Sequence, residues 1–60
     1  MREYTLAELF RLTRAELFAL HHRIATHLAQ LPEDSPERPV ALTNMRNIRR
    51  VLARSKLTPT

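Results

Sequence analysis

The sequence has 60 residues, of which ten are Lys or Arg, six are Asp or Glu and three are His, so its formal charge is +4. A chain of this length forms one small domain that buries only about 60% of its unfolded surface, so we expect oligomerisation or a binding partner to supplement its core. Because cysteine is absent, disulfides and thiolate metal sites are excluded.

Two consecutive copies of the pattern T-x-A-E-L-F-x-L occupy residues 5–12 and 13–20. In each copy a Thr precedes a Glu by three positions, which is the spacing of a capping box at the start of a helix. Each copy also has two apolar residues at the spacing of a hydrophobic staple, namely Tyr4 with Leu9, and Leu12 with Leu17. The sequence therefore predicts a short helix over about residues 5–12 and a second helix that begins near Thr13.

The alternative is one continuous helix from residue 6 to residue 31. Apolar residues recur every three or four positions over this range, and neither Gly nor Pro interrupts them, so a single apolar seam is also possible. Thr13 would then be a polar residue within that seam. We favour a break near Thr13, because the cap and the staple coincide there.

The second helix is predicted over about residues 13–31 and carries a broad apolar arc. Its central stripe consists of Leu17, Leu20, Ile24, Leu28 and Leu31. The arc is wider than one neighbouring helix requires, so we expect a second contact on it. Pro32 ends this helix, because the residue before a proline is disfavoured in helical conformation.

The third helix is predicted over about residues 36–54, with Ser35 as its N-cap and Pro36 at its first position. The short connection makes the second and third helices an antiparallel hairpin, so the expected fold is all-α in a single domain. Residues 55–60 are expected to form a frayed tail. The core face of the third helix is lined by Ala41, Met45, Ile48 and Leu52, flanked by Leu42 and Val51.

The positive charge is concentrated in the last part of the chain. Residues 1–34 have four Arg against five carboxylates, whereas residues 35–60 have five Arg and one Lys against a single Glu, so the net charges are −1 and +5. Such a polarised basic segment indicates an anionic partner, either nucleic acid or an acidic protein surface. A solvated face that keeps the protein soluble is the simpler explanation.

Arginines recur at every fourth position on the face of the third helix opposite its apolar residues. Their planar guanidinium groups suit phosphate oxygens, so we predict contacts to the backbone of a nucleic acid. The predicted contact residues are Arg46, Arg49, Arg50, Arg54, Lys56 and Asn47.

A protein–protein interface is the alternative function. Apolar and aromatic side chains near the start of the chain are numerous for so small a hairpin, and they favour a homodimer or a small regulator or inhibitor of a larger protein. The candidate interface residues are Tyr4, Leu9, Phe10, Leu12 and Phe18.

Other function classes have little support. His21, His22 and His27 are separated by one, five and six positions, whereas helical metal ligands need a spacing of three or four, so we expect no metal and no cofactor. The chain has neither a candidate nucleophile nor paired carboxylates in an apolar setting, and it is too small to enclose a substrate, so we expect no catalysis and no small-molecule substrate. No apolar run reaches transmembrane length and no signal-peptide pattern is present, so we expect no membrane contact and, by default, a cytoplasmic location.

Residues 16–26 read ELFALHHRIAT and residues 48–56 read IRRVLARSK. The first segment resembles the E-L-F-x-L-x-x-x-[IL]-A-T run of bacterial large-subunit ribosomal proteins of the helical-hairpin type, and the second is similar to the closing basic helix of that family. The segment between these runs is longer here and contains three prolines. The resemblance implies binding to ribosomal RNA, with contacts from Arg49, Arg50, Arg54 and Lys56.

Overall fold

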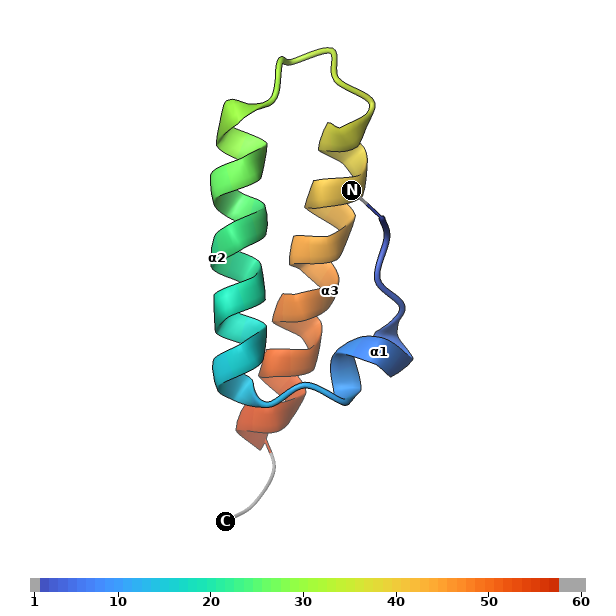
Figure 1. Cartoon of the computed structure of the whole chain (residues 1–60). Coiled ribbons are helices and arrows are strands. Elements are labelled where there is room, and N and C mark those ends of the chain that lie inside the picture. The colour runs from blue at the N-terminus through green and yellow to red at the C-terminus, as the bar shows by residue number, and fades with distance from the viewer. Residues whose placement is uncertain (1, 58–60) are drawn as a thin grey trace.

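The computed structural model describes the backbone of residues 2–57 and the side chains of residues 2–54. It contains a short helix α1 (Leu6–Phe10) and two long helices, α2 (Arg14–Gln30) and α3 (Glu37–Leu57) (Figure 1). The described part of the chain has no strand, so the predicted all-α fold, with a short helix before a helical hairpin, is confirmed. Helix α3 continues three residues beyond its expected end, and residues 58–60 of the expected tail lie outside the described residues.

The predicted break near Thr13 is present, and the continuous helix is excluded. Both capping boxes form: the amide of Glu8 donates to Oγ1 of Thr5 and the amide of Glu16 donates to Oγ1 of Thr13, each over 3.1 Å. Each Glu carboxylate accepts in return from the amide of its own Thr. Thr13 has an extended backbone, with φ of −71° and ψ of 165°, and therefore cannot continue the helix that precedes it.

The hairpin of α2 and α3 is joined at both ends by arginine side chains. Near the turn, Nη1 of Arg38 donates to the carbonyl oxygens of Leu28 and Leu31, both at 3.4 Å. Leu28 lies in the last turn of α2, where its carbonyl also accepts from the Leu31 amide, and Leu31 is the C-cap residue that follows the helix. At the opposite end, Nη1 of Arg14 lies 3.5 Å from the carbonyl oxygen of Leu52. Oγ of Ser35 accepts from the amide of Glu37, as predicted for a capping side chain, but α3 begins at Glu37, so Pro36 precedes the helix rather than occupying its first position.

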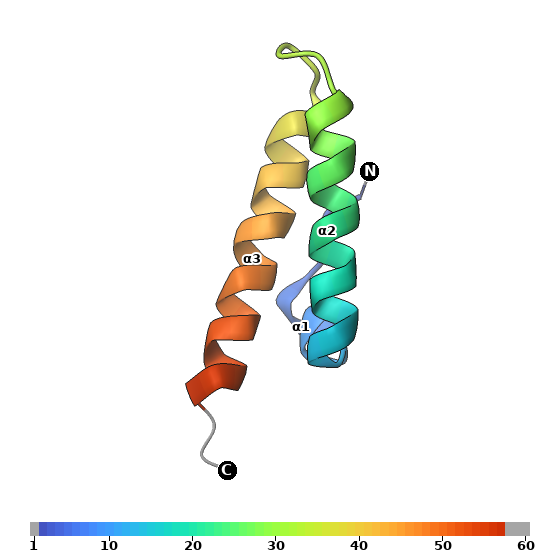
Figure 2. The same cartoon turned by 90° about the vertical axis from the view of Figure 1, so that its left-hand side faces the viewer.

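Helix α3 is the central element, because it packs against both α2 and α1. The two views place α2 and α1 on different flanks of α3 but both toward the same side of it (Figures 1 and 2). The opposite, outer side of α3 is therefore not covered by another element.

The core lies where α3 meets the other two helices. Seven buried apolar side chains form it, namely Leu9, Leu17, Ile24, Ala41, Ile48, Val51 and Leu52. The staple residues Tyr4 and Leu12 are partly buried against this cluster, together with Leu20, Leu28 and Met45. One expected flanking residue differs, since Leu42 remains 52% exposed and is not part of the core.

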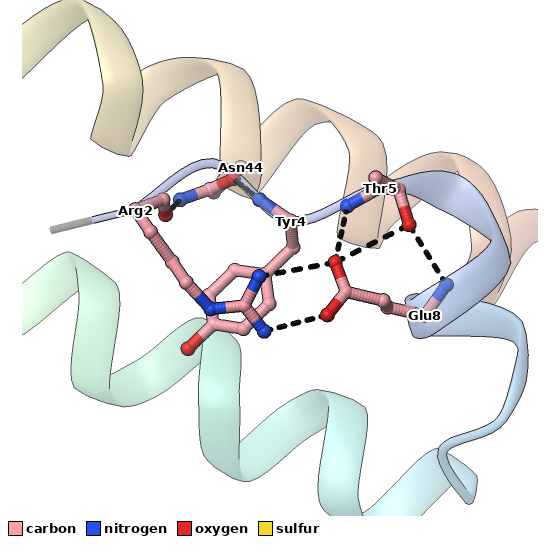
Figure 3. A network of polar contacts seen from close by, with 5 residues as sticks. All are labelled: Arg2, Tyr4, Thr5, Glu8 and Asn44. Carbon is pink, nitrogen blue, oxygen red and sulfur yellow. Dashed lines mark hydrogen bonds and ion pairs between the residues drawn. The ribbon is translucent and has the colours of Figure 1, made fainter.

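The N-terminal segment is attached to α3 by a buried asparagine that no pattern in the sequence predicts. The amide of Tyr4 donates to Oδ1 of Asn44, and Nδ2 of Asn44 donates to the carbonyl oxygen of Arg2, both over 2.9 Å (Figure 3). The Asn44 side chain is fully buried, and these two bonds satisfy an acceptor and a donor that would otherwise lack partners. They place the extended segment before α1 alongside α3.

Candidate functional site

Three of the predicted phosphate-binding arginines lie on the outer side of α3. Arg46, Arg49 and Arg50 are exposed, and none of them forms an ion pair with a carboxylate in the described part of the chain. Because their guanidinium groups form no hydrogen bond or ion pair with described residues, these donor groups are available to a ligand. We call Arg46, Arg49, Arg50 and Arg54 the basic surface.

The remaining predicted contacts have different environments. The guanidinium carbon of Arg54 lies 5.4 Å from the centroid of the Phe10 ring, so this arginine links the basic surface to α1. Asn47 is only partly exposed, and no hydrogen bond is formed by its side chain within the described residues. Lys56 belongs to α3, but its side chain lies outside the described residues.

The predicted protein-interface residues divide between core and surface. Leu9 is completely buried, so its side chain cannot reach a partner, and Tyr4 and Leu12 pack partly against the core. Phe10 and Phe18, in contrast, remain 51% and 54% exposed. Among the predicted interface residues, these two aromatic rings therefore combine large apolar area with access from solvent.

Each exposed ring borders a hollow beside the C-terminal half of α3. The hollow between α1 and α3 has a volume of about 380 Å³ and is lined by Leu6, Phe10, Arg50, Val51, Ala53 and Arg54. The hollow between α2 and α3 has a volume of about 240 Å³ and is lined by Arg14, Phe18, Arg49, Leu52 and Ala53. We call these the α1 hollow and the α2 hollow. Ala53 lines both, so they lie on the two sides of one narrow ridge.

The carboxylates that engage cations lie elsewhere on the molecule. Glu8 accepts from both terminal nitrogens of Arg2, at 3.1 and 2.6 Å, and the Arg2 guanidinium also lies over the Tyr4 ring (Figure 3). The hydrogen bonds from Arg2, and then from the Thr5 amide, lower the pKa of Glu8 to about 2. Glu37 contacts His27 at the turn end of the hairpin, with Oε1 at 3.2 Å from Nε2. No described carboxylate lines either hollow.

The three histidines have different environments. Within residues 2–54, no three His, Asp or Glu side chains are placed so that they could hold a metal ion together. His22 is exposed, His27 contacts Glu37, and Nε2 of His21 is buried without a described hydrogen-bond partner. None of the three borders the α1 or α2 hollow.

Leu6, Arg14 and Ala53 line the hollows but are not among the site residues predicted from the sequence. Arg14 precedes Phe18 by four positions, which places its guanidinium carbon 5.4 Å from the ring centroid, and this spacing was a usable signal. No pattern in the sequence indicates that Ala53 belongs to the site. This small, exposed side chain lines both hollows, and a larger side chain at this position would reduce the space in each.

Comparisons with known proteins identify no relative of this chain. No protein-family model matches the sequence, and no curated protein or solved structure is significantly similar to it. The resemblance to ribosomal helical-hairpin proteins therefore stays a prediction. Among the described helices, none has the length and apolar character needed to cross a lipid bilayer.

Proposed function

We propose that this protein is a non-catalytic nucleic-acid-binding protein that contacts the phosphate backbone through the basic surface of α3. The observation that carries the proposal is the exposure of Arg46, Arg49 and Arg50 on one side of α3, without ion pairs to described carboxylates. Arginines used for internal structure behave differently, since Arg2, Arg14 and Arg38 all donate hydrogen bonds within the fold.

The spacing along α3 supports the same proposal. Arg46, Arg50 and Arg54 extend over about 12 Å of helix rise, which allows contacts to more than one phosphate. Arginine binds phosphate oxygens through paired donors, so such contacts fix the orientation of the ligand without reading its sequence. The ribosomal resemblance is consistent with this role, since it implies RNA contacts from the same end of the chain.

The test compares two variants with the same loss of charge. R46A/R50A removes two arginines of the basic surface, and R11A/R23A removes two exposed arginines from other parts of the molecule. Binding to labelled RNA and DNA is measured by fluorescence anisotropy over a range of salt concentrations. We expect R46A/R50A to weaken binding and to reduce the slope of log K against log salt by about 1.5, since each phosphate contact contributes about 0.7 to 0.9.

The control variant R11A/R23A is expected to retain most of the affinity and the slope of the wild type. Equal losses in both variants would show that only net charge matters, and this would overturn the assignment to α3. Absence of binding by the wild-type protein to either nucleic acid would overturn the proposed function itself.

A second candidate function is association with a protein, including a second copy of this chain. The observation that favours it is the exposure of four large apolar side chains, namely Leu6, Phe10, Phe18 and Leu42. Replacing Phe10 or Phe18 with a polar residue would then disrupt association, and added salt would change it little.

A further inference from the structure

The duplicated T-x-A-E-L-F-x-L pattern places two phenylalanines in equivalent positions. In each copy the fifth residue, Leu9 or Leu17, is buried in the core, and the sixth, Phe10 or Phe18, is about half exposed. Successive side chains on a helix point about 100° apart, so a buried Leu turns the following Phe toward the surface. The repeat thus presents one accessible aromatic ring from α1 and another from α2.

The two rings flank the same part of α3. Phe10 borders the α1 hollow together with Arg50 and Arg54, and Phe18 borders the α2 hollow together with Arg14 and Arg49. Each ring also has a guanidinium carbon 5.4 Å from its centroid. Each hollow therefore offers a flat apolar surface next to two positive charges.

We infer that the two hollows receive unpaired bases of a single-stranded nucleic acid whose phosphates lie against the arginines of α3. This inference rests on the proposed function and specifies its ligand. Bases stack on aromatic rings and on guanidinium planes, and this stacking is the usual way in which proteins hold single strands. The exposed Ala53 between the hollows leaves room for the strand to cross α3 from one hollow to the other.

Charge complementarity favours a single-stranded nucleic acid over an apolar helix as the ligand of the two hollows. An apolar helix docked over the rings would remove the guanidinium groups of Arg49 and Arg50 from water without supplying acceptors, which is unfavourable. A nucleotide supplies a planar base for the ring and a phosphate for the guanidinium. A duplex keeps its bases paired and stacked, so it offers only its phosphates to this surface.

The test uses the full chain with F10L/F18L, which removes the aromatic faces but keeps apolar side chains and every arginine. Four labelled probes of equal length are compared by anisotropy at one salt concentration: single-stranded RNA, single-stranded DNA, an abasic single strand and a duplex. Circular dichroism checks that the variant has the helix content and thermal unfolding of the wild type.

We expect the wild type to bind the base-containing single strands at least about tenfold more tightly than the abasic strand, as expected for stacking of one or more bases. F10L/F18L should lose this difference, bind the abasic strand and the duplex as the wild type does, and keep the same salt slope. Comparison of the single-stranded RNA and single-stranded DNA probes shows which of the two nucleic acids binds more tightly.

Three outcomes would overturn the inference. Equal binding of all probes by the wild type and by F10L/F18L would leave phosphate binding by α3 intact but remove the base-stacking role. Binding of no probe by the wild type would remove the proposed function as well. A dimer of the protein alone that F10L/F18L dissociates, without any effect on the probes, would assign the rings to a protein interface.

Discussion

Asn44 is the single polar side chain that is completely buried within the described residues. Its side-chain amide accepts from the amide of Tyr4 and donates to the carbonyl oxygen of Arg2. The Asn44 side chain thus makes the pair of hydrogen bonds that the backbone of a neighbouring β-strand would make. They hold the extended segment that leads into α1, so the position of Phe10 depends on a residue far from it in the sequence.

We predict that Asn44→Ala lowers the free energy of unfolding by about 2 kcal/mol, because both backbone groups lose their buried partner. The amide of Tyr4 should also exchange with solvent faster. Denaturant unfolding and hydrogen exchange measure these changes. Asn47→Ala is the matched control and should alter stability by less than about 0.5 kcal/mol, since no described hydrogen bond depends on Asn47. Equal losses in the two variants would contradict this account of Asn44.

The Arg2–Glu8 pair predicts a dependence of stability on pH. The pKa of Glu8 is lowered from 4.5 to about 2 in the folded protein, mainly by its hydrogen bonds with Arg2. A lowered pKa stabilises the fold at pH values above about 4.5, and this contribution is lost as the pH falls toward about 2. Glu8→Gln should therefore be less stable than the wild type at neutral pH, and the difference should shrink across this window.

Thermal unfolding of the wild type, Glu8→Gln and Arg2→Ala at several acidic pH values provides the measurement. Arg2→Ala removes the main cause of the pKa shift and should reduce the same pH dependence. A difference between wild type and Glu8→Gln that stays constant across this pH range would contradict the role of Glu8 ionisation.

At the scale of the helices, the break between α1 and α2 gives the site its geometry. The chain leaves α1 at Phe10, passes through the extended Thr13 and starts α2 in a new direction. A continuous helix would put Phe10 and Phe18 on one straight rod, about 12 Å apart along its axis. The break instead places the two rings on different flanks of α3.

We predict that Thr13→Ala lowers the free energy of unfolding by about 1 kcal/mol, because the amide of Glu16 loses its cap. Thr26→Ala is the control: Thr26 is exposed inside α2, and alanine has the better helix propensity, so stability should stay the same or rise slightly. Circular dichroism melting of the two variants makes the comparison. A Thr13→Ala protein as stable as the wild type would show that the cap is not what fixes the break.

At the scale of the whole molecule, charge and apolar surface coincide. Phe10 and Phe18 lie among arginines, in a chain with a formal charge of +4. Pairing two copies through these rings would bring like charges together, which is unfavourable.

We therefore predict that the protein alone sediments as a monomer at low and high salt. A faster-sedimenting complex should form only with added nucleic acid and should dissociate at high salt. Analytical ultracentrifugation at two salt concentrations, with and without nucleic acid, measures both effects. A dimer of the protein alone that persists at high salt would instead favour the protein–protein function.

The sequence by itself determined the local features of this protein. The two Thr–Glu boxes, the stop at Pro32 and the cap at Ser35 depend on residues three or fewer positions apart, so the three helices and the break at Thr13 followed from spacing alone. The helical period likewise placed Arg46 and Arg50 opposite the core face, where the structure has them exposed.

Only the tertiary structure decided which side chains meet across helices. Leu9 and Phe10 are adjacent and were both predicted at a protein interface, yet packing buries Leu9 in the core and leaves Phe10 51% exposed. Asn44 resembles Asn47 in sequence, but only the N-terminal segment gives it partners. The two hollows exist because α1 and α2 approach α3 from different flanks, which depends on long-range packing rather than on the spacing of residues within one helix.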